Sequence, residues 1–265
     1  MQSLVHSRPA PGTSFPTPAN LAANQSDVIW LVAEEVPVAF EYNRRAHAVM
    51  MATPADLEDF ALGFSLCEGI LASRGDVDDI RVRHAADGIV LSVACDPLKL
   101  LKGSLRQRSM EGRSGCGLCG VDSLANVLRP PRPVTASFVP DAGAVAFAFA
   151  RLAEHQPMNR ANRSLHAAAW CDPSGRIRMA REDVGRHNAL DKLAGALAAG
   201  EHDLSAGFAV LSSRCSFELV QKAAAVGIPF LATVSAPTGL ALTLARKAGM
   251  TLAARAPRDG VMLFR

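Results

Sequence analysis

Residues 208–255 read FAVLSSRCSFELVQKAAAVGIPFLATVSAPTGLALTLARKAGMTLAAR and alternate short apolar runs with longer amphipathic ones. The short runs predict strands, and the longer runs, with apolar residues every three or four positions, predict helices. The predicted strands are 208–211, 229–234 and 251–255, and the predicted helices are 216–225 and 237–248. Strands that alternate with helices are typical of a layered α/β domain in which some strands pair in parallel.

Two polar loops of this stretch each follow a predicted strand and precede a predicted helix. They are Ser212-Ser-Arg-Cys-Ser216 and Ser235-Ala-Pro-Thr-Gly239. If the strands are parallel, both loops open on the same edge of the sheet, where α/β proteins bind anions. Helix capping explains either loop alone, but the two together, beside nearby arginines, favour a nucleotide-sized pocket. Cys215 is expected to be a small buried residue and not a nucleophile.

The alternation continues on both sides of this stretch. It predicts a buried helix over 141–154, a hairpin of strands 166–171 and 176–180, a helix over 188–199 and a last strand over 261–264. These elements together form a predicted C-terminal α/β domain over residues 135–265.

The N-terminal part predicts a smaller α+β domain over residues 28–95. Strands are expected over 28–35, 36–42 and 47–52, followed by a helix that Thr53 caps and by a hairpin of 80–83 and 89–94. The overall expectation is thus α/β, with an α+β arrangement of the two domains. Residues 1–27, which have no continuous apolar run, are expected to be a disordered leader and not a signal peptide.

Composition places the chain among ordinary globular proteins. Its 265 residues are 49% hydrophobic and 20% charged, with a net charge of +3, so no strong field for nucleic acid follows from the total. The longest uncharged run, between Lys222 and Arg246, contains glycines and prolines at its centre, which argues against a membrane span. We expect a cytoplasmic protein whose six cysteines are reduced.

A basic, glycine-rich connection over residues 96–134 carries two cysteines in the sequence RSGCGLCGVD, residues 113–122. Cys116 and Cys119 have a spacing that suits zinc binding, a redox disulfide or a reactive sulfur. Zinc is disfavoured because the chain offers no second cysteine pair and no deaminase-type ligand motif. No apolar strand enters the pair, which weakens the thioredoxin-like alternative.

The flanking residues favour reactive sulfur. Glycines on both sides supply backbone freedom, and the cationic residues between Lys99 and Arg113 favour the thiolate form. From the residues alone, a persulfide carrier and a dithiol redox couple both remain open.

A second polar stretch, REDVGRHNALDK over residues 181–192, packs seven ionisable side chains and an asparagine into twelve positions. One interpretation is a pocket at a helix N-terminus, where Arg186, His187 and Asn188 meet a phosphate or a base. The other is a capping and salt-bridge cluster that orients the helix. The sequence does not choose between them.

Four separated motifs together resemble those of the FdhD family, the formate dehydrogenase accessory sulfurtransferases. They are MMATPADLEDFALGFSLCEGI at 50–70, CGLCG at 116–120, REDVGRHNALDKL at 181–193, and SFELVQKA with GIPFLATVSAPTGLALTLA at 216–245. The resemblance covers about residues 28 to 265 and implies a cytoplasmic homodimer. It also implies a C-terminal domain similar to cytidine deaminases but without the zinc site.

The resemblance also implies a function. A cysteine desulfurase would supply sulfur as a persulfide on the CxxC segment. The sulfur would then pass to the molybdenum (or tungsten) cofactor with two guanine dinucleotides, Mo-bis(molybdopterin guanine dinucleotide), bound as a substrate before its insertion into formate dehydrogenase. The alternatives are a CxxC dithiol oxidoreductase and a cofactor-binding chaperone without catalysis.

Site residues are carried over by position in the motifs. Cys116 would hold the persulfide and Cys119 would be its partner. The cofactor-binding segment falls on Ala254, Arg255, Ala256, Pro257, Arg258 and Asp259. This chain departs from the family pattern at Ala254, where an aromatic residue is usual, and at Asn162-Arg-Ser-Leu-His166. Independently of the family, Arg255 and Arg258 are suitable donors to a pyrophosphate.

Overall fold

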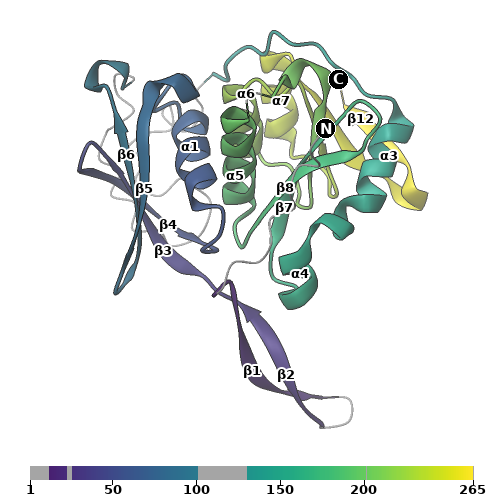
Figure 1. Cartoon of the computed structure of the whole chain (residues 1–265). Coiled ribbons are helices and arrows are strands. Elements are labelled where there is room, and N and C mark those ends of the chain that lie inside the picture. Colours follow the sequence, from purple (N-terminus) through teal and green to yellow (C-terminus); the bar gives the residue numbers. More distant parts are fainter. Residues whose placement is uncertain (1–11, 23–25, 101–129, 201, 265) are drawn as a thin grey trace.

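Two sheets enclose a double layer of helices, and a further helix covers the outer face of the larger sheet (Figure 1). The structure is a computed structural model that describes residues 12–22, 26–100, 130–200 and 202–264. The smaller sheet has the strand order β4-β3-β6-β5, and the larger sheet has the order β12-β11-β10-β9-β7-β8. A third, two-stranded sheet of β1 and β2 projects from the body (Figure 1).

The elements have the following bounds. The strands are β1 Ser14–Leu21, β2 Ser26–Ala33, β3 Val36–Tyr42, β4 Arg45–Ala52, β5 Val77–Ala85, β6 Gly88–Cys95, β7 His166–Cys171, β8 Ile177–Asp183, β9 Phe208–Leu211, β10 Phe230–Thr233, β11 Thr251–Arg255 and β12 Val261–Phe264. The α-helices are α1 Leu57–Cys67, α3 Ala142–Arg151, α4 Pro157–Asn162, α5 Arg186–Ala199, α6 Phe217–Ala225 and α7 Gly239–Ala248.

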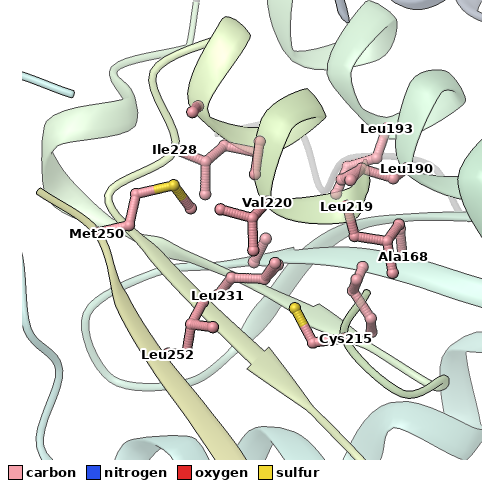
Figure 2. Close-up of a cluster of buried hydrophobic side chains, with 14 of the residues drawn as sticks. Ala168, Leu190, Leu193, Cys215, Leu219, Val220, Ile228, Leu231, Met250 and Leu252 are labelled. Carbon is pink, nitrogen blue, oxygen red and sulfur yellow. The ribbon is translucent and has the colours of Figure 1, made fainter. Parts of the chain in front are cut away.

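The opening stretch folds as its pattern predicts. Strands β9, β10 and β11 pair in parallel, and every residue of β9 and β10 is buried, because helices cover both faces of the sheet. Figure 2 shows the main core on one of these faces, where Leu219 and Val220 of α6 lie over Leu231 and Leu252 of the strands. The predicted hairpin of β7 and β8 is also present.

Two expectations for the N-terminal part differ from the structure. Part of the expected disordered leader, Ser14–Leu21, forms β1 and pairs antiparallel with β2. Thr53 does not cap α1, which begins at Leu57 after Asp56. The Thr53 hydroxyl instead accepts a hydrogen bond from the Val184 amide at 3.1 Å, because a partner about 130 residues away competes with the local cap.

Helices α1 and α5 join the two parts of the chain at backbone distance. A Cβ added to Gly63 would overlap the Asp191 carbonyl oxygen, and one added to Gly195 would overlap the Asp59 carbonyl oxygen. Glycine at both positions therefore lets the helices approach more closely than side chains allow. The consequence is that α1, which packs on the N-terminal sheet, lies directly against α5 of the C-terminal part.

Buried charges surround this helix contact. The Lys192 ammonium lies 2.7 Å from the Asp183 carboxylate, and both side chains are fully buried. Lys192 also donates to the Thr53 carbonyl oxygen at 2.9 Å. The Lys222 ammonium lies 2.9 Å from Asp191 and 2.9 Å from Glu68, the residue that follows α1. Burial opposes the charge of Lys222, but the two carboxylates outweigh burial and raise its pKa.

None of the helices in the described part of the chain is long and apolar enough to cross a membrane.

Candidate functional site

Four strands of the larger sheet end at one edge. Strands β9, β10 and β11 are parallel, and β8 points the same way because both β8 and β9 are antiparallel to β7. Helices α5, α6 and α7 begin at this edge, after β8, β9 and β10. Helix N-termini carry partial positive charge and unpaired backbone N–H groups, so several of them at one edge favour an anion.

The two polar loops of the opening stretch are joined at this edge. The Ser235 amide donates to the Ser213 carbonyl oxygen at 3.3 Å, and the Thr238 amide donates to the Cys215 carbonyl oxygen at 3.0 Å. The Thr238 hydroxyl caps α7 by accepting from the Ala241 amide at 3.2 Å. The prediction that both loops open on the same edge is confirmed.

Five polar side chains gather where α5 and α6 begin; together they are called the edge cluster: His166, Arg186, His187, Ser216 and Glu218. The His187 Nε2 atom lies 3.4 Å from the Ser216 hydroxyl and 3.7 Å from the Glu218 carboxylate. The Arg186 Nε atom is buried and has no hydrogen-bond partner among the described residues. An orphaned guanidinium donor beside two histidines is a site that an anionic ligand would complete.

Two members of the edge cluster differ in charge: Glu218 is ionised and His166 is neutral. Burial raises the pKa of Glu218, but hydrogen bonds from His187 and Ser216 outweigh burial and lower it to about 2, so Glu218 stays a carboxylate. Burial, with Arg186 and His187 nearby, lowers the pKa of His166 below its ordinary value. His166 therefore stays neutral at pH 7 and keeps one acceptor and one donor nitrogen.

The stretch 181–192 divides between the edge cluster and the contact of the two parts of the chain. Arg186 and His187 belong to the edge cluster, as the pocket interpretation requires. Asp183 and Lys192 lie at the contact between the two parts of the chain, as does Asn188, which donates to the Met51 carbonyl oxygen at 2.8 Å. The salt-bridge interpretation is confirmed for Asp183 and Lys192, whereas the binding of a phosphate or a base by Arg186 and His187 stays a prediction.

The predicted cofactor segment lies at the same edge of the sheet. Arg255 ends β11 and is exposed, and Arg258 is exposed in the short 3₁₀ helix that follows, with a positive φ of 58°. Ala254, by contrast, is only 4% exposed within β11. The two arginines lie at the end of a strand that neighbours β10, so the segment and the edge cluster share one edge of one sheet.

Cys116 and Cys119 lie outside the described residues, as does the helix predicted over 121–128. The other four cysteines, Cys67, Cys95, Cys171 and Cys215, are buried. Burial raises the pKa of each thiol, and it raises the pKa of Cys215 to about 12, so these cysteines are poor nucleophiles. Cys215 is thus the buried residue that the sequence predicted.

The described residues that flank the cysteine segment lie at the opposite edge of the molecule from the edge cluster. On one side, the Val134 amide donates to the carbonyl oxygen of Ala248, the last residue of α7. On the other side, Lys99 pairs with Asp76 at 2.9 Å, and Asp76 binds the Ser73 amide. Ser73 lines a hollow of about 290 Å³ at the C-terminal ends of α5 and α6, away from the ends where the cluster lies.

Two members of the edge cluster were not singled out from the sequence as site residues. Glu218 reads as an ordinary acid in the first turn of a helix, and His166 reads as the first residue of a strand. Only their positions in the sequence could have indicated them, because each lies next to a strand end at the same edge of the sheet. In the parts of the chain that the structure describes, no group of three or more His, Cys, Asp or Glu side chains is arranged to hold a metal ion.

Comparison with known proteins identifies one family. Residues 33–265 match the model of the FdhD/NarQ family. A protein of Cupriavidus necator named sulfur carrier protein FdhD is 53% identical over 226 residues, which cover 84% of this chain and 77% of that relative. A protein of the same name from Chromobacterium violaceum is 50% identical over 238 residues, 88% of this chain and 87% of the relative.

A solved structure shares the fold. It comes from Desulfotalea psychrophila and is described as that of a formate dehydrogenase accessory protein. Its TM-score is 0.72 at 23% identity, with 95% of this chain and 96% of that chain covered. This likeness and the observed layers confirm the predicted fold class. Because the family model matches most of the chain and the relatives are about half identical to it, the chain belongs to the FdhD/NarQ family, as its four motifs predicted.

Proposed function

We propose that this protein is a sulfur carrier that accepts persulfide sulfur on Cys116 and delivers it to a molybdenum cofactor. The observation that carries the proposal is its identity of about one half to proteins named sulfur carrier protein FdhD. The buried cysteines support it, because the four in the described residues are poor nucleophiles and thus leave Cys116 and Cys119 for the chemistry.

The first step is a persulfide exchange with a cysteine desulfurase. The Cys116 thiolate attacks the outer sulfur of the persulfide on the donor. The sulfur–sulfur bond of the donor breaks, its cysteine leaves as a thiolate, and Cys116 then carries the sulfur as a persulfide. The cationic residues between Lys99 and Arg113 favour the attacking thiolate.

The second step releases the sulfur and explains the need for two cysteines. The Cys119 thiolate attacks the inner sulfur of the persulfide, which forms a Cys116–Cys119 disulfide and releases hydrosulfide. Hydrosulfide replaces an oxygen ligand of the metal, and that oxygen leaves as water with the proton of hydrosulfide and one from solvent. A cellular dithiol then reduces the disulfide.

The proposed acceptor is Mo-bis(molybdopterin guanine dinucleotide), bound as a substrate at the edge where the strands end. Its pyrophosphates suit the helix N-termini, the orphaned Arg186 donor and the exposed Arg255 and Arg258. We propose that formate dehydrogenase receives the sulfurated cofactor in the cytoplasm and that the carrier acts as a homodimer.

Intact-mass measurement tests the first step. After incubation with a cysteine desulfurase and cysteine, the wild type and the Cys119→Ala variant should each gain the mass of a sulfur atom, whereas Cys116→Ala should not. Cys215→Ala is the matched control, since the Cys215 thiol is buried, and it should load like the wild type. Equal loading of Cys116→Ala and wild type would overturn the assignment.

Formate dehydrogenase activity in cells that lack their own copy of the carrier tests delivery. The wild type should restore activity, and the Cys116→Ala, Cys119→Ala double variant should not. Restoration by the double variant would mean that the protein acts only as a cofactor-binding chaperone. A disulfide that turns over with a thiol donor, without any loaded sulfur, would mean that it is a dithiol oxidoreductase.

A further inference from the structure

Strand β12 forms one outer edge of the larger sheet, beside α3 (Figure 1). It pairs with β11 on one side, and among the described residues no strand pairs with its other side. The outer side of an edge strand presents backbone N–H and C=O groups that can pair with another chain. Such an edge is therefore suited to an extended segment of a partner protein.

The pairing with β11 determines which backbone groups of β12 point outward. The Ala256 amide donates to the Gly260 carbonyl oxygen at 2.8 Å, at the end of the β11–β12 hairpin. Hydrogen-bonded pairs alternate with other pairs along antiparallel strands, so the backbone groups of Met262 face β11. Those of Val261 and Leu263 therefore point away from β11, towards the outer side of the edge.

Strand β12 lacks the features that close the other edges of the two larger sheets. Proteins protect sheet edges with charged side chains, prolines and bulges. The outer strands β5 and β8 each contain four acidic or arginine residues, and a bulge interrupts the pairing of β4 with β3. Strand β12 has the sequence VMLF, with no charge and no proline, and its pairing has no register shift. Its edge is thus compatible with a further strand.

The side chains of β12 favour an apolar partner on both faces of the sheet. Val261 and Leu263 are half-buried and pack on the hydrophobic cluster beneath α3. On the other face, Phe264 packs on the main core and Met262 is 52% exposed. A strand paired with β12 would cover side chains on both faces, where cross-strand apolar pairs stabilise a sheet.

A positive charge lies at one end of the edge. Arg258 is exposed in the connection that precedes β12, and it forms no ion pair with the side chains that the structure describes. A partner strand that runs antiparallel to β12 ends beside this connection, because β12 begins there at Val261. Acidic residues at the C-terminal end of the partner's apolar run would therefore complement Arg258.

We propose that β12 binds an extended apolar segment of a different protein, which ends in acidic residues, by antiparallel strand addition. Val261 and Leu263 each donate one N–H and offer one C=O to the segment, and Arg258 contacts its acidic end. The proposal rests on the edge of the sheet and not on the sulfur chemistry, so its failure would leave the proposed function intact.

Fluorescence anisotropy of synthetic peptides with the full chain, free of cofactor, tests the proposal. The probe peptide alternates valine and threonine and ends in two glutamates. One control peptide ends in two lysines, and another has proline in place of its central valine. The probe should bind saturably, and each control should bind at least about tenfold more weakly. A probe that does not bind saturably, or a lysine peptide that binds equally well, would overturn the proposal.

Two pairs of variants separate the backbone contact from the charge. Leu263→Pro removes an outward N–H but no hydrogen bond to β11, whereas Leu263→Ala shortens the side chain and keeps the N–H. The proline variant should bind the probe about tenfold more weakly than the alanine variant, and equal binding would overturn the strand addition. Arg258→Glu should reverse the preference between the glutamate and lysine peptides. Arg83→Glu, at an exposed position of β5 in the other sheet, is the matched control and should not change it.

Hydrogen exchange of the wild type provides a measurement that does not depend on the variants. The Val261 and Leu263 amides should exchange rapidly alone and become protected when the probe peptide binds, whereas the Met262 amide should be protected in both states. Protection of Val261 and Leu263 without peptide would overturn the proposal. If that protection were lost on dilution, a second copy of the chain would occupy the edge; if it were lost on deletion of residues 1–11, the chain's own N-terminus would do so.

Discussion

At the scale of single residues, Glu182 shows how burial couples folding to pH. Its side chain is fully buried and accepts hydrogen bonds from the Met158 amide at 2.9 Å and the Asn159 amide at 2.7 Å, at the start of α4. Burial raises the pKa of Glu182 from 4.5 to about 7, although the two amides oppose the shift. Between these values the folded state holds a proton that the unfolded state has released.

This proton determines whether the free energy of unfolding rises or falls with pH. Because the folded state binds more protons, the contribution of Glu182 to the free energy of unfolding falls as pH rises from 4.5 towards 7. The shift corresponds to about 3 kcal/mol over the whole window. Glu182→Gln should remove this fall. In urea unfolding, the free energy of unfolding of the variant relative to the wild type should therefore rise by about 3 kcal/mol between pH 4.5 and pH 7.

Glu154→Gln is the control for the pH series, because Glu154 is an exposed carboxylate, 58% accessible, in a surface pair with Arg151. Its difference from the wild type should stay within about 1 kcal/mol at every pH. A Glu182→Gln variant whose stability follows the wild type in parallel across the window would contradict the raised pKa of Glu182.

At the scale of elements, the crossing of α1 and α5 depends on two glycines. Gly195→Ala should lower the free energy of unfolding by about 1–3 kcal/mol or more, since the added Cβ overlaps the Asp59 carbonyl oxygen and forces the helices apart. This loss opposes the gain of up to about 1 kcal/mol that alanine brings to a helix. Denaturant unfolding measures the net effect.

The matched control for this crossing is Gly239→Ala at the start of α7, where an added Cβ meets no atom within 4 Å. Its stability should be unchanged or slightly raised. Opposite signs at the two glycines would locate the effect at the helix contact, whereas equal effects would mean that packing between α1 and α5 tolerates the methyl group.

Most elements could be predicted from the sequence because their patterns are local. The alternation of residues 208–255 predicted three strands and two helices, with some strands paired in parallel, and each element is present. The exceptions depend on distant partners. Thr53 has the residue type of a cap, but its hydroxyl binds Val184. The strand β1 contains Pro16 and Pro18, and prolines argue against a strand in a sequence-based prediction. They are compatible with β1 because both nitrogens point away from β2, which only the pairing reveals.

The candidate site was predictable only in part, for the same reason. The two polar loops and Arg186 and His187 stood out by their composition. Glu218 did not, because its pairing with His187 across 3.7 Å depends on how α5 and α6 lie over the sheet. No local pattern contains that information.

At the scale of the whole molecule, we predict that contacts among the described residues hold the two parts of the chain together without the covalent connection over residues 101–129. The helix crossing, the hydrogen bond from Lys192 to the Thr53 carbonyl oxygen and the pair of Lys222 with Glu68 do so. A protease site inserted between Met110 and Glu111 should therefore allow cleavage into two fragments that still elute together in size-exclusion chromatography.

The same cleavage in a Gly195→Ala background is the sharper comparison. There the weakened helix contact should allow the fragments to separate at lower denaturant concentration than in the parent. Fragments of the parent that elute separately in buffer would show that the covalent connection is needed to hold them.

The close contact of Gly63 with α5 has a consequence for how such a chain can change over generations. Lengthening a connection costs little entropy, about 0.6 kcal/mol per doubling, and here the body is already joined by its helices. We therefore expect mutations between residues 101 and 129 to change the free energy of unfolding little. Under the proposed function, selection on that segment acts through Cys116 and Cys119, whereas Gly63 and Gly195 are constrained by the helix crossing.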